Sequence, residues 1–344
     1  SEWKQAAHLL QRMQRDALDL DLVALNATMS AFSQGSSWAA ALQLLAEADE
    51  KRLELDAMAL NAAIGACGKG SNWNTAMALF ADLLRRELQP TVVTCVAVVS
   101  ACDRGHQWRL ALAAFDSLLA RGVKPNVVAT SACISACAHG ALWERGLALL
   151  AKGEHLDVVA FNAAIDACGK GRRWRDAMRL LGDIWAAGLE PDSSSYTATI
   201  SACGDGQEWA QALFVFGSMH RCRIPPTVMA YSAAITACVD ASQWFRALHI
   251  FDDIHCRCLE PDIIGTSAVI AACRAGGRWQ KALWHFREIR RRSLVPDLGA
   301  FRAITVTLVE LGQTRFAMEV YQESVAMGLD WHDSGGPPVR DALA

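Results

Sequence analysis

The stretch Ile165-Asp166-Ala167-Cys168-Gly169-Lys170-Gly171-Arg172-Arg173-Trp174 decides how this chain folds, because close copies of it recur along the sequence. One copy runs from Ile64 to Trp73 and another from Ile200 to Trp209. The tryptophan that ends the stretch returns every 35 residues, apart from one step of 31, at Trp3, Trp38, Trp73, Trp108, Trp143, Trp174, Trp209, Trp244 and Trp279. A fixed period in this range indicates stacked supersecondary units rather than one globular core.

Each unit contains two helical patterns. In the unit that holds the quoted stretch, Phe161, Ile165 and Cys168 are spaced i, i+4 and i+7, which places them on one face of a first helix. Two glycines break that helix, and a second helix with the same spacing starts at Trp174 and is expected to end at Gly188. Neither helix can bury its apolar stripe alone, so neighbours must stack on it. The sequence therefore predicts an all-α solenoid of helical hairpins.

Nine tandem units follow when a boundary is set after each Pro-Asp-type pair: 22–56, 57–91, 92–126, 127–157, 158–192, 193–227, 228–262, 263–297 and 298–332. Residues 1–21 are expected to hold the second helix of a truncated repeat, and we therefore expect a piece of a longer protein. Unit 127–157 is four residues short, which predicts a shortened second helix. Unit 298–332 carries Leu308 and Thr314 in the Cys and Trp positions, as in a capping unit. The Gly/Pro-rich segment 333–344 is expected to be a disordered tail.

Composition limits the classes of function. Hydrophobic residues make up 52% of the chain, which is ample for a continuous core. The net charge of −3 argues against tight, indiscriminate nucleic-acid binding, whose affinity comes mostly from cations at phosphates. No apolar run approaches the length that a membrane span needs, so no membrane insertion is expected, and no targeting segment is visible.

The cysteines are not arranged as in a disulfide framework. Seven of the twelve cysteines hold the same position of successive units: Cys67, Cys102, Cys137, Cys168, Cys203, Cys238 and Cys273. This regularity predicts small apolar core residues and a reducing compartment. The tryptophans are likewise expected to pack on the neighbouring unit rather than to stack on bases.

The units resemble the pentatricopeptide repeat (PPR) family. The resemblance rests on the period of 35, on the opening Val158-Val159-Ala160-Phe161-Asn162, and on the close Gly188-Leu189-Glu190-Pro191-Asp192. It covers residues 2–332. Tetratricopeptide units have a period of 34 and another pattern, and HEAT and armadillo units are longer. The tryptophan marks a lineage-specific variant of the P-type subclass. The resemblance implies a right-handed superhelical array.

The resemblance also implies single-stranded RNA along the concave face, with one base per repeat read by two side chains. The fifth residues of the repeats would be Asn26, Asn61, Ser131, Asn162, Thr197, Ser232 and Ser267, with Val96 and Arg302 departing from the pattern. The last residues that pair with them would be Asp56, Thr91, Asp157, Asp192, Thr227, Asp262 and Asp297. Apolar second residues would wedge between bases: Val23, Met58, Val93, Val128, Val159, Met229 and Ile264.

In this family, Asn at the fifth position accompanies pyrimidines, Ser or Thr accompanies purines, and a last-position Asp favours guanine or uracil. Read from 5′ to 3′, the array would then select U, C (or U), unread, G, U, A, G, G, unread. The position after the first helix, which often offers Lys to phosphate in the family, supplies Lys69, Arg104 and Lys170. The same position holds Asp205 and Asp240 further along, so the positive stripe is reversed in the C-terminal half.

Several of these residues fit a purely structural role as well. Asp, Thr and Asn before a helix are also preferred N-caps. The polar fifth-position column does not distinguish RNA from protein contacts. The arginines at 287 and 290–292 lie on a second helix, where a solvated face or a protein contact is favoured. His220, Cys222, His255, Cys256 and Cys258 could meet a zinc ion, but their spacing is atypical, and no metal site is expected.

No catalytic set recurs or stands apart from the repeat, so no enzyme, cofactor or small-molecule substrate is expected. The leading hypothesis is a sequence-selective, single-stranded RNA-binding protein of an organelle, chloroplast or mitochondrion, acting in transcript stability, processing or translation. The alternative is a scaffold subunit held by protein contacts in a large organellar assembly. The acidic C-terminal half and the uncharged fifth positions favour that alternative.

Overall fold

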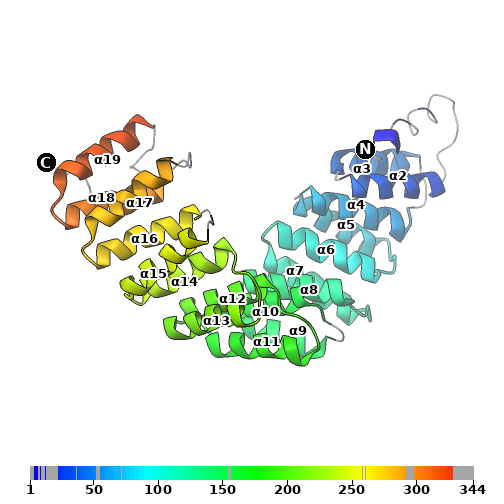
Figure 1. Cartoon of the computed structure of the whole chain (residues 1–344). Helices are drawn as coiled ribbons and strands as arrows, with labels where there is room; N and C mark the ends of the chain where they lie inside the picture. Colours follow the sequence, from blue (N-terminus) through cyan, green and yellow to red (C-terminus); the bar gives the residue numbers. More distant parts are fainter. Residues whose placement is uncertain are drawn as a thin grey trace. The chain divides into compact units, whose positions relative to one another are not determined.

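The computed structural model describes residues 4–6, 8, 12, 22–35, 37–51, 55–70, 72–153, 156–257, 259, 261–291 and 298–327. These residues form helices and turns with no strand among them, so the predicted all-α class is confirmed (Figure 1). The chain divides into two compact units, Ser1–Ala167 and Cys168–Ala344, and the division falls within helix α10 (Val158–Lys170). Most of the predicted N-terminal helix and all of the predicted tail lie outside the described residues.

Each unit is a stack of helical hairpins. The helices of the first unit are α2 (Leu22–Gln34), α3 (Trp38–Glu50), α4 (Ala57–Lys69), α5 (Trp73–Arg85), α6 (Val92–Arg104), α7 (Trp108–Ala120), α8 (Val127–His139) and α9 (Trp143–Lys152). Helix α9 has 10 residues where the other second helices have 13, as the four-residue shortening of the repeat 127–157 predicts. The missing residues therefore shorten the second helix and leave α8 at full length.

The second unit contains α11 (Trp174–Ala186), α12 (Ser193–Asp205), α13 (Trp209–Arg221), α14 (Val228–Asp240), α15 (Trp244–Cys256), α16 (Ile263–Ala275), α17 (Trp279–Arg291), α18 (Leu298–Glu310) and α19 (Thr314–Ala326). Helix α11 ends at Ala186, two residues before the predicted end. Gly188 has a φ of +74° in the turn that follows, which places it in the left-handed region that glycine adopts without strain.

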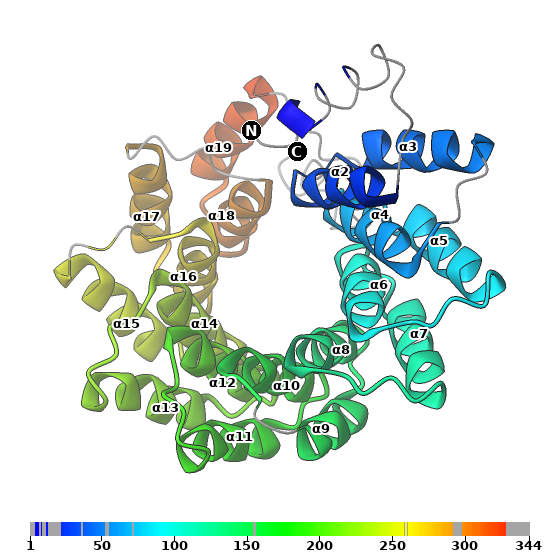
Figure 2. The same cartoon turned by 90° about the vertical axis from the view of Figure 1, so that its right-hand side faces the viewer.

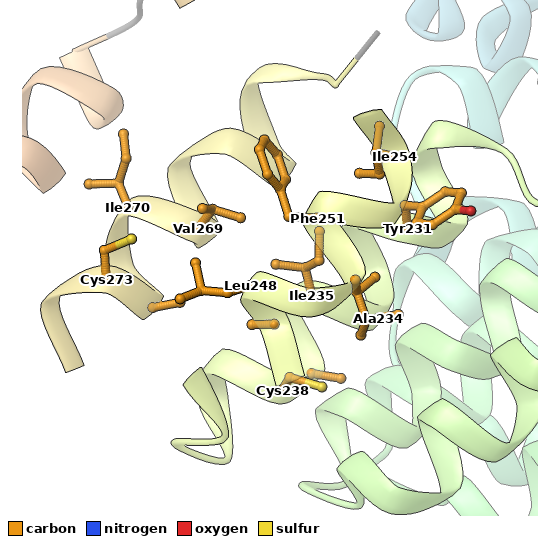
Figure 3. Packing of buried hydrophobic residues seen from close by; sticks show 14 of the residues in the cluster. Tyr231, Ala234, Ile235, Cys238, Leu248, Phe251, Ile254, Val269, Ile270 and Cys273 are labelled. Atoms are coloured by element: carbon orange, nitrogen blue, oxygen red, sulfur yellow. The ribbon is translucent and has the colours of Figure 1, made fainter. Parts of the chain in front are cut away.

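The core of each unit is formed by small and aliphatic residues between neighbouring hairpins. Figure 3 shows Tyr231, Ile235 and Cys238 of α14 gathered with Phe251 of α15 and Val269 of α16. All seven column cysteines are buried and free, which confirms their structural role. Burial raises the pKa of several of these thiols, for example Cys168 and Cys238 to about 11. The thiols therefore remain neutral core groups near pH 7.

The tryptophan column packs against the next hairpin. A Cβ added to Gly206 would lie 2.7 Å from Cδ1 of Trp174, and one added to Gly276 would lie 2.8 Å from Cδ2 of Trp244. In the first unit Gly140 stands in the same relation to Trp108, at 2.8 Å from its Cδ2. The ring thus fills the space left by the glycine at the end of the next first helix, and the predicted inter-repeat packing is confirmed.

Within each unit the first helices form one row and the second helices another (Figure 2). Each first helix packs on the next first helix, and a second helix packs against two of them at α3, α5, α7, α13, α15 and α17. Small residues allow this close approach, since a Cβ on Gly68 of α4 would lie 3.0 Å from Cβ of Ala101 on α6. The same holds for Gly204 of α12 and Ala237 of α14, at 3.1 Å. The row of first helices therefore presents a tightly spaced, regular surface.

Candidate nucleic-acid interface

The second residues of the repeats form an exposed apolar column on the first helices. All seven predicted wedge residues are more than half exposed: Val23 75%, Met58 67%, Val93 63%, Val128 55%, Val159 64%, Met229 63% and Ile264 64%. Ser194 of α12 and Gly299 of α18, which break the apolar pattern, are exposed at the same position. Folding gives these side chains no partner, so the column is a surface that the repeat keeps open for contacts.

In the first unit the fifth residue of a repeat contacts the last residue of the same repeat. Asn26 Nδ2 donates to Asp56 Oδ2 at 2.9 Å, and Asn61 Nδ2 donates to Thr91 Oγ1 at 3.4 Å. The Ser131 hydroxyl has one proton and two acceptors within reach, the carbonyl oxygen of Val127 at 2.8 Å and Asp157 Oδ1 at 3.2 Å. The fold thus brings the fifth and last residues of these three repeats into contact.

The second unit repeats this pairing at one repeat and departs from it at another. Ser232 donates to Asp262 Oδ1 at 2.6 Å. The Thr197 hydroxyl donates instead to the carbonyl of Ser193 at 2.7 Å, one turn back in its own helix. Asp297, the predicted partner of Ser267, lies outside the described residues.

Each last-position residue that the structure describes also caps the helix that follows it. Asp56 Oδ1 accepts from the backbone N–H of Ala59 at 2.8 Å, and Asp262 Oδ1 accepts from that of Gly265 at 2.7 Å. Asn126, Asp157, Asp192, Thr227 and Thr91 cap α8, α10, α12, α14 and α6 in the same way. Capping and pairing are therefore both present, and the capping role does not exclude a role in pairing.

A hollow of about 680 Å³ lies over α2, α4 and α6 of the first unit. It brings together the three predicted classes of residue: the fifth and last residues Asn26, Asn61 and Thr91, the wedges Met58 and Val93, and the cations Lys69 and Arg104. Val96, the fifth residue that cannot form a hydrogen bond, lines the same hollow. One surface of the first unit thus combines amide and hydroxyl groups, apolar side chains and positive charge.

The corresponding surface of the second unit has the opposite charge. A hollow of about 220 Å³ over α12, α14 and α16 is lined by Thr197, Ser232, Asp262 and the wedges Met229 and Ile264. Two carboxylates, Asp205 and Asp240, line this hollow where the first unit has cations. Lys170 lies beside both carboxylates in an adjoining hollow. A polyanion meets cations on the first unit and carboxylates on the second.

The structure adds residues that the fifth-position pattern does not include. Ser30, Ser33 and Ser100 line the hollow of the first unit, and Ser201 and Thr236 line that of the second. Ser30 lies four residues after Asn26, on the same face of α2, so helical periodicity could have identified this position. His139 holds the position of Lys69 and Arg104 in its own repeat, and the structure adds its contact, with Nδ1 lying 3.0 Å from Asp103 Oδ1 of α6.

The zinc interpretation finds no support in the described part of the chain. Among the described residues no three His, Cys, Asp or Glu side chains lie together as a metal site. Tyr196 donates to Cys222 Sγ at 3.4 Å, while Cys258 and the side chains of His255 and Cys256 lie outside the description. No described helix combines the length and the apolar character that crossing a membrane requires.

The protein is a stack of two-helix repeats whose first helices carry exposed columns of polar and apolar side chains. These features are those of a helical-repeat protein that binds a partner along its first helices. Family models match three separate stretches: the PPR repeat family at residues 156–205, the pentatricopeptide repeat domain at residues 78–139, and the PPR repeat at residues 267–294. The chain belongs to the pentatricopeptide repeat family.

Solved structures agree with this assignment at the level of fold. The chain is similar to the pentatricopeptide repeat protein PPR10 in complex with an 18-nt psaJ RNA element, with a TM-score of 0.70 and 17% identity, over 96% of this chain and 54% of that one. PPR10 from maize gives a TM-score of 0.63 and 22% identity, over 99% and 54% of the two chains. The chain thus spans about half the length of these structures. No curated protein sequence matches it.

Proposed function

We propose that the chain is a sequence-selective, single-stranded RNA-binding protein that acts in an organelle on transcript stability, processing or translation. The observation that carries the proposal is the hollow of the first unit, where fifth and last residues, wedges and cations line one surface. RNA is held in this way by apolar contacts to bases, hydrogen bonds to base edges and cations at phosphates. The likeness to PPR10 bound to RNA supports the same function, and the organelle rests on the family alone.

Hydrogen-bond polarity supports a reading role for the side-chain pairs. Asn26 Nδ2 donates one of its protons to Asp56. This hydrogen bond fixes the orientation of the Asn26 amide, because the flipped amide would place Oδ1 against a carboxylate oxygen. The second N–H is left for a base, next to a carboxylate that only accepts. A base edge with an acceptor beside an N–H, such as O4 and N3–H of uracil, matches this pair.

The pairs with other residues have a different polarity. Ser232 gives its only proton to Asp262, so this pair presents acceptors and matches the N–H groups of guanine. Thr91 can donate as well as accept, unlike a carboxylate, so the pair with Asn61 suits a base whose N3 carries no proton, as in cytosine. These matches agree with U, C and G at the first, second and seventh positions of the proposed RNA.

Binding to a synthetic nine-mer tests the proposal. The sequence U, C, any base, G, U, A, G, G, any base should bind more tightly than a scrambled RNA of the same composition in fluorescence anisotropy. Ser232→Asn should move the preference at the seventh base from guanine to uracil, by roughly fivefold for one hydrogen bond of about 1 kcal/mol. Ser232→Ala, the matched control, should lose discrimination there without gaining uracil. Equal binding of both RNAs would refute the proposal.

The chain is proposed to bind RNA without cleaving or modifying it, because its polar residues recur with the repeat and form no acid–base or nucleophilic set. Incubation of the labelled nine-mer with the purified chain should leave its length unchanged on a denaturing gel. A scaffold subunit, the alternative, would bind RNA weakly and with no base preference, so the same anisotropy assay separates the two functions.

A further inference from the structure

Among the described residues, the second helices of the unit 168–344 carry four exposed aromatic side chains, Trp185 of α11 and one on each of α13, α15 and α17. Phe214 of α13, Phe245 of α15 and Trp284 of α17 are 56%, 69% and 54% exposed. Phe214 and Trp284 hold the same position of hairpins that are two apart, and Phe245 lies one turn before that position in the hairpin between them. Because residues four apart share a helix face, the three side chains belong to one face of the outer row that α13, α15 and α17 form in Figure 2.

The repeat fold does not require these aromatic residues. At the same position of the hairpins in the first unit the sequence has small or polar residues: Gln43, Ala78, Ala113 and Ala148. The fold therefore forms equally well around alanine here. Exposed aromatic side chains that recur over three hairpins, with no role in the core, mark a contact surface.

Positive charge accompanies the aromatic residues. The guanidinium of Arg221 lies 5.1 Å from the ring centre of Phe214. Lys281 and Arg287 are exposed and lie three residues before and three after Trp284, on the same face of α17. Two carboxylates share the surface with these cations, Glu288 four residues after Trp284 and the exposed Asp252 of α15 at the position of Arg287. The sequence adds arginines at 290, 291 and 292, whose side chains are outside the description. We call the surface of Phe214, Phe245, Trp284, Arg221, Lys281 and Arg287 the outer aromatic face.

We propose that the outer aromatic face binds an anionic lipid surface as a peripheral contact. Aromatic rings favour the headgroup region of a bilayer, and lysine and arginine are attracted to anionic lipids. This face lies on the second helices and is independent of the RNA interface on the first helices.

Vesicle co-sedimentation of the full chain tests this assignment. The chain should sediment with vesicles of phosphatidylglycerol and phosphatidylcholine and remain in solution with phosphatidylcholine alone. Lys281→Gln with Arg287→Gln should weaken binding about 25-fold, since each cation near an anionic membrane contributes roughly fivefold. Phe245→Ser with Trp284→Ser should weaken it by at least about tenfold. Leu119→Ser is the matched control, because Leu119 is an apolar side chain 41% exposed on α7 of the other unit.

Five results would overturn the assignment. Three come from the vesicles: no sedimentation with the anionic vesicles, equal sedimentation with both vesicles, or an equal loss in Leu119→Ser. A fourth is a fall in RNA affinity in the aromatic variants, which would make the face a nucleic-acid surface. A change in the sedimentation coefficient of the lipid-free chain on Phe245→Ser with Trp284→Ser would indicate self-association and would also overturn it. Binding of the nine-mer by every variant, with unchanged circular dichroism, keeps this test separate from the proposed RNA function.

Discussion

Replacing Gly206 by alanine tests the packing that sets the repeat. Gly206 ends α12 with φ −78° and ψ 1°, a conformation that alanine adopts without strain. The added Cβ would lie 2.7 Å from Cδ1 of Trp174 and 3.1 Å from its Cβ and Cγ. Carbon atoms in contact prefer about 3.5–4.0 Å, so the ring must move by roughly 1 Å. The effect is therefore a displacement of Trp174 rather than a change of backbone.

The free energy of unfolding should fall by about 1–2 kcal/mol in Gly206→Ala. Overpacking lowers the free energy of unfolding by roughly 1–3 kcal/mol. Alanine also makes the unfolded chain less flexible than glycine does, and this raises the free energy of unfolding by about 0.4–1 kcal/mol. Ala241 follows Trp209 at the same spacing as Gly206 follows Trp174, which indicates that the ring can turn to admit a methyl group. We therefore place the cost in the lower part of the range.

Gly217→Ala is the matched control. Gly217 lies within α13, and a Cβ there would meet nothing within 4 Å. Alanine should stabilise this helix by up to about 1 kcal/mol. Urea unfolding followed by circular dichroism should thus give shifts of opposite sign for the two variants, and Trp174→Leu should relieve the cost of Gly206→Ala in a double-mutant cycle. Equal stability of Gly206→Ala and Gly217→Ala would refute the packing argument.

Three further predictions concern the site and the core. Lys69→Gln should reduce the slope of log K against log salt by about 0.7, where K is the association constant for the nine-mer, and an unchanged slope would contradict a phosphate role for Lys69. Asp240→Asn should raise the affinity for the nine-mer, because it removes a carboxylate from the RNA surface. Asp262→Ala should remove the cap of α16, lower the free energy of unfolding by about 1 kcal/mol and abolish the preference for guanine. Asp262→Asn should keep the cap. Unchanged base selectivity in both variants would contradict a role of Asp262 in pairing. Burial raises the pKa of Cys95 and Cys102 to about 11, so their neutral form stabilises the fold fully below the unfolded thiol pKa of about 8.5, and this stability should be lost as pH rises toward 11. Alkaline urea titrations measure that loss, and a flat stability between pH 8 and 11 would contradict it.

The regular part of the fold could be predicted because the same pattern of apolar and helix-breaking residues recurs in every repeat. Phe161, Ile165 and Cys168 mark the buried face of a first helix, and the tryptophan that follows marks the start of a second. Single boundaries were less certain, as the end of α11 at Ala186 instead of Gly188 illustrates. A helix end depends on which carbonyl groups find a partner in the following turn, and that choice is made by local geometry.

The candidate site was predictable by position and unpredictable in its contacts. The wedge positions follow from the family resemblance, and the structure shows all seven side chains exposed. The pairs are not uniform, since Thr197 donates to its own helix while Ser232 donates across to Asp262. A hydroxyl has one proton and several acceptors within reach, so its choice depends on distances that no spacing rule contains.

The sequence by itself determined the architecture of this protein, because a 35-residue period of apolar faces and breakers can be buried only by stacking like units. Only the tertiary structure decided which atoms of the fifth and last residues meet and which proton each donates. It also decided that the ring of Trp174 lies against Gly206. The reason is physical: periodicity fixes the face on which a side chain lies, whereas hydrogen bonds and close packing depend on differences of less than an ångström between elements distant in the chain.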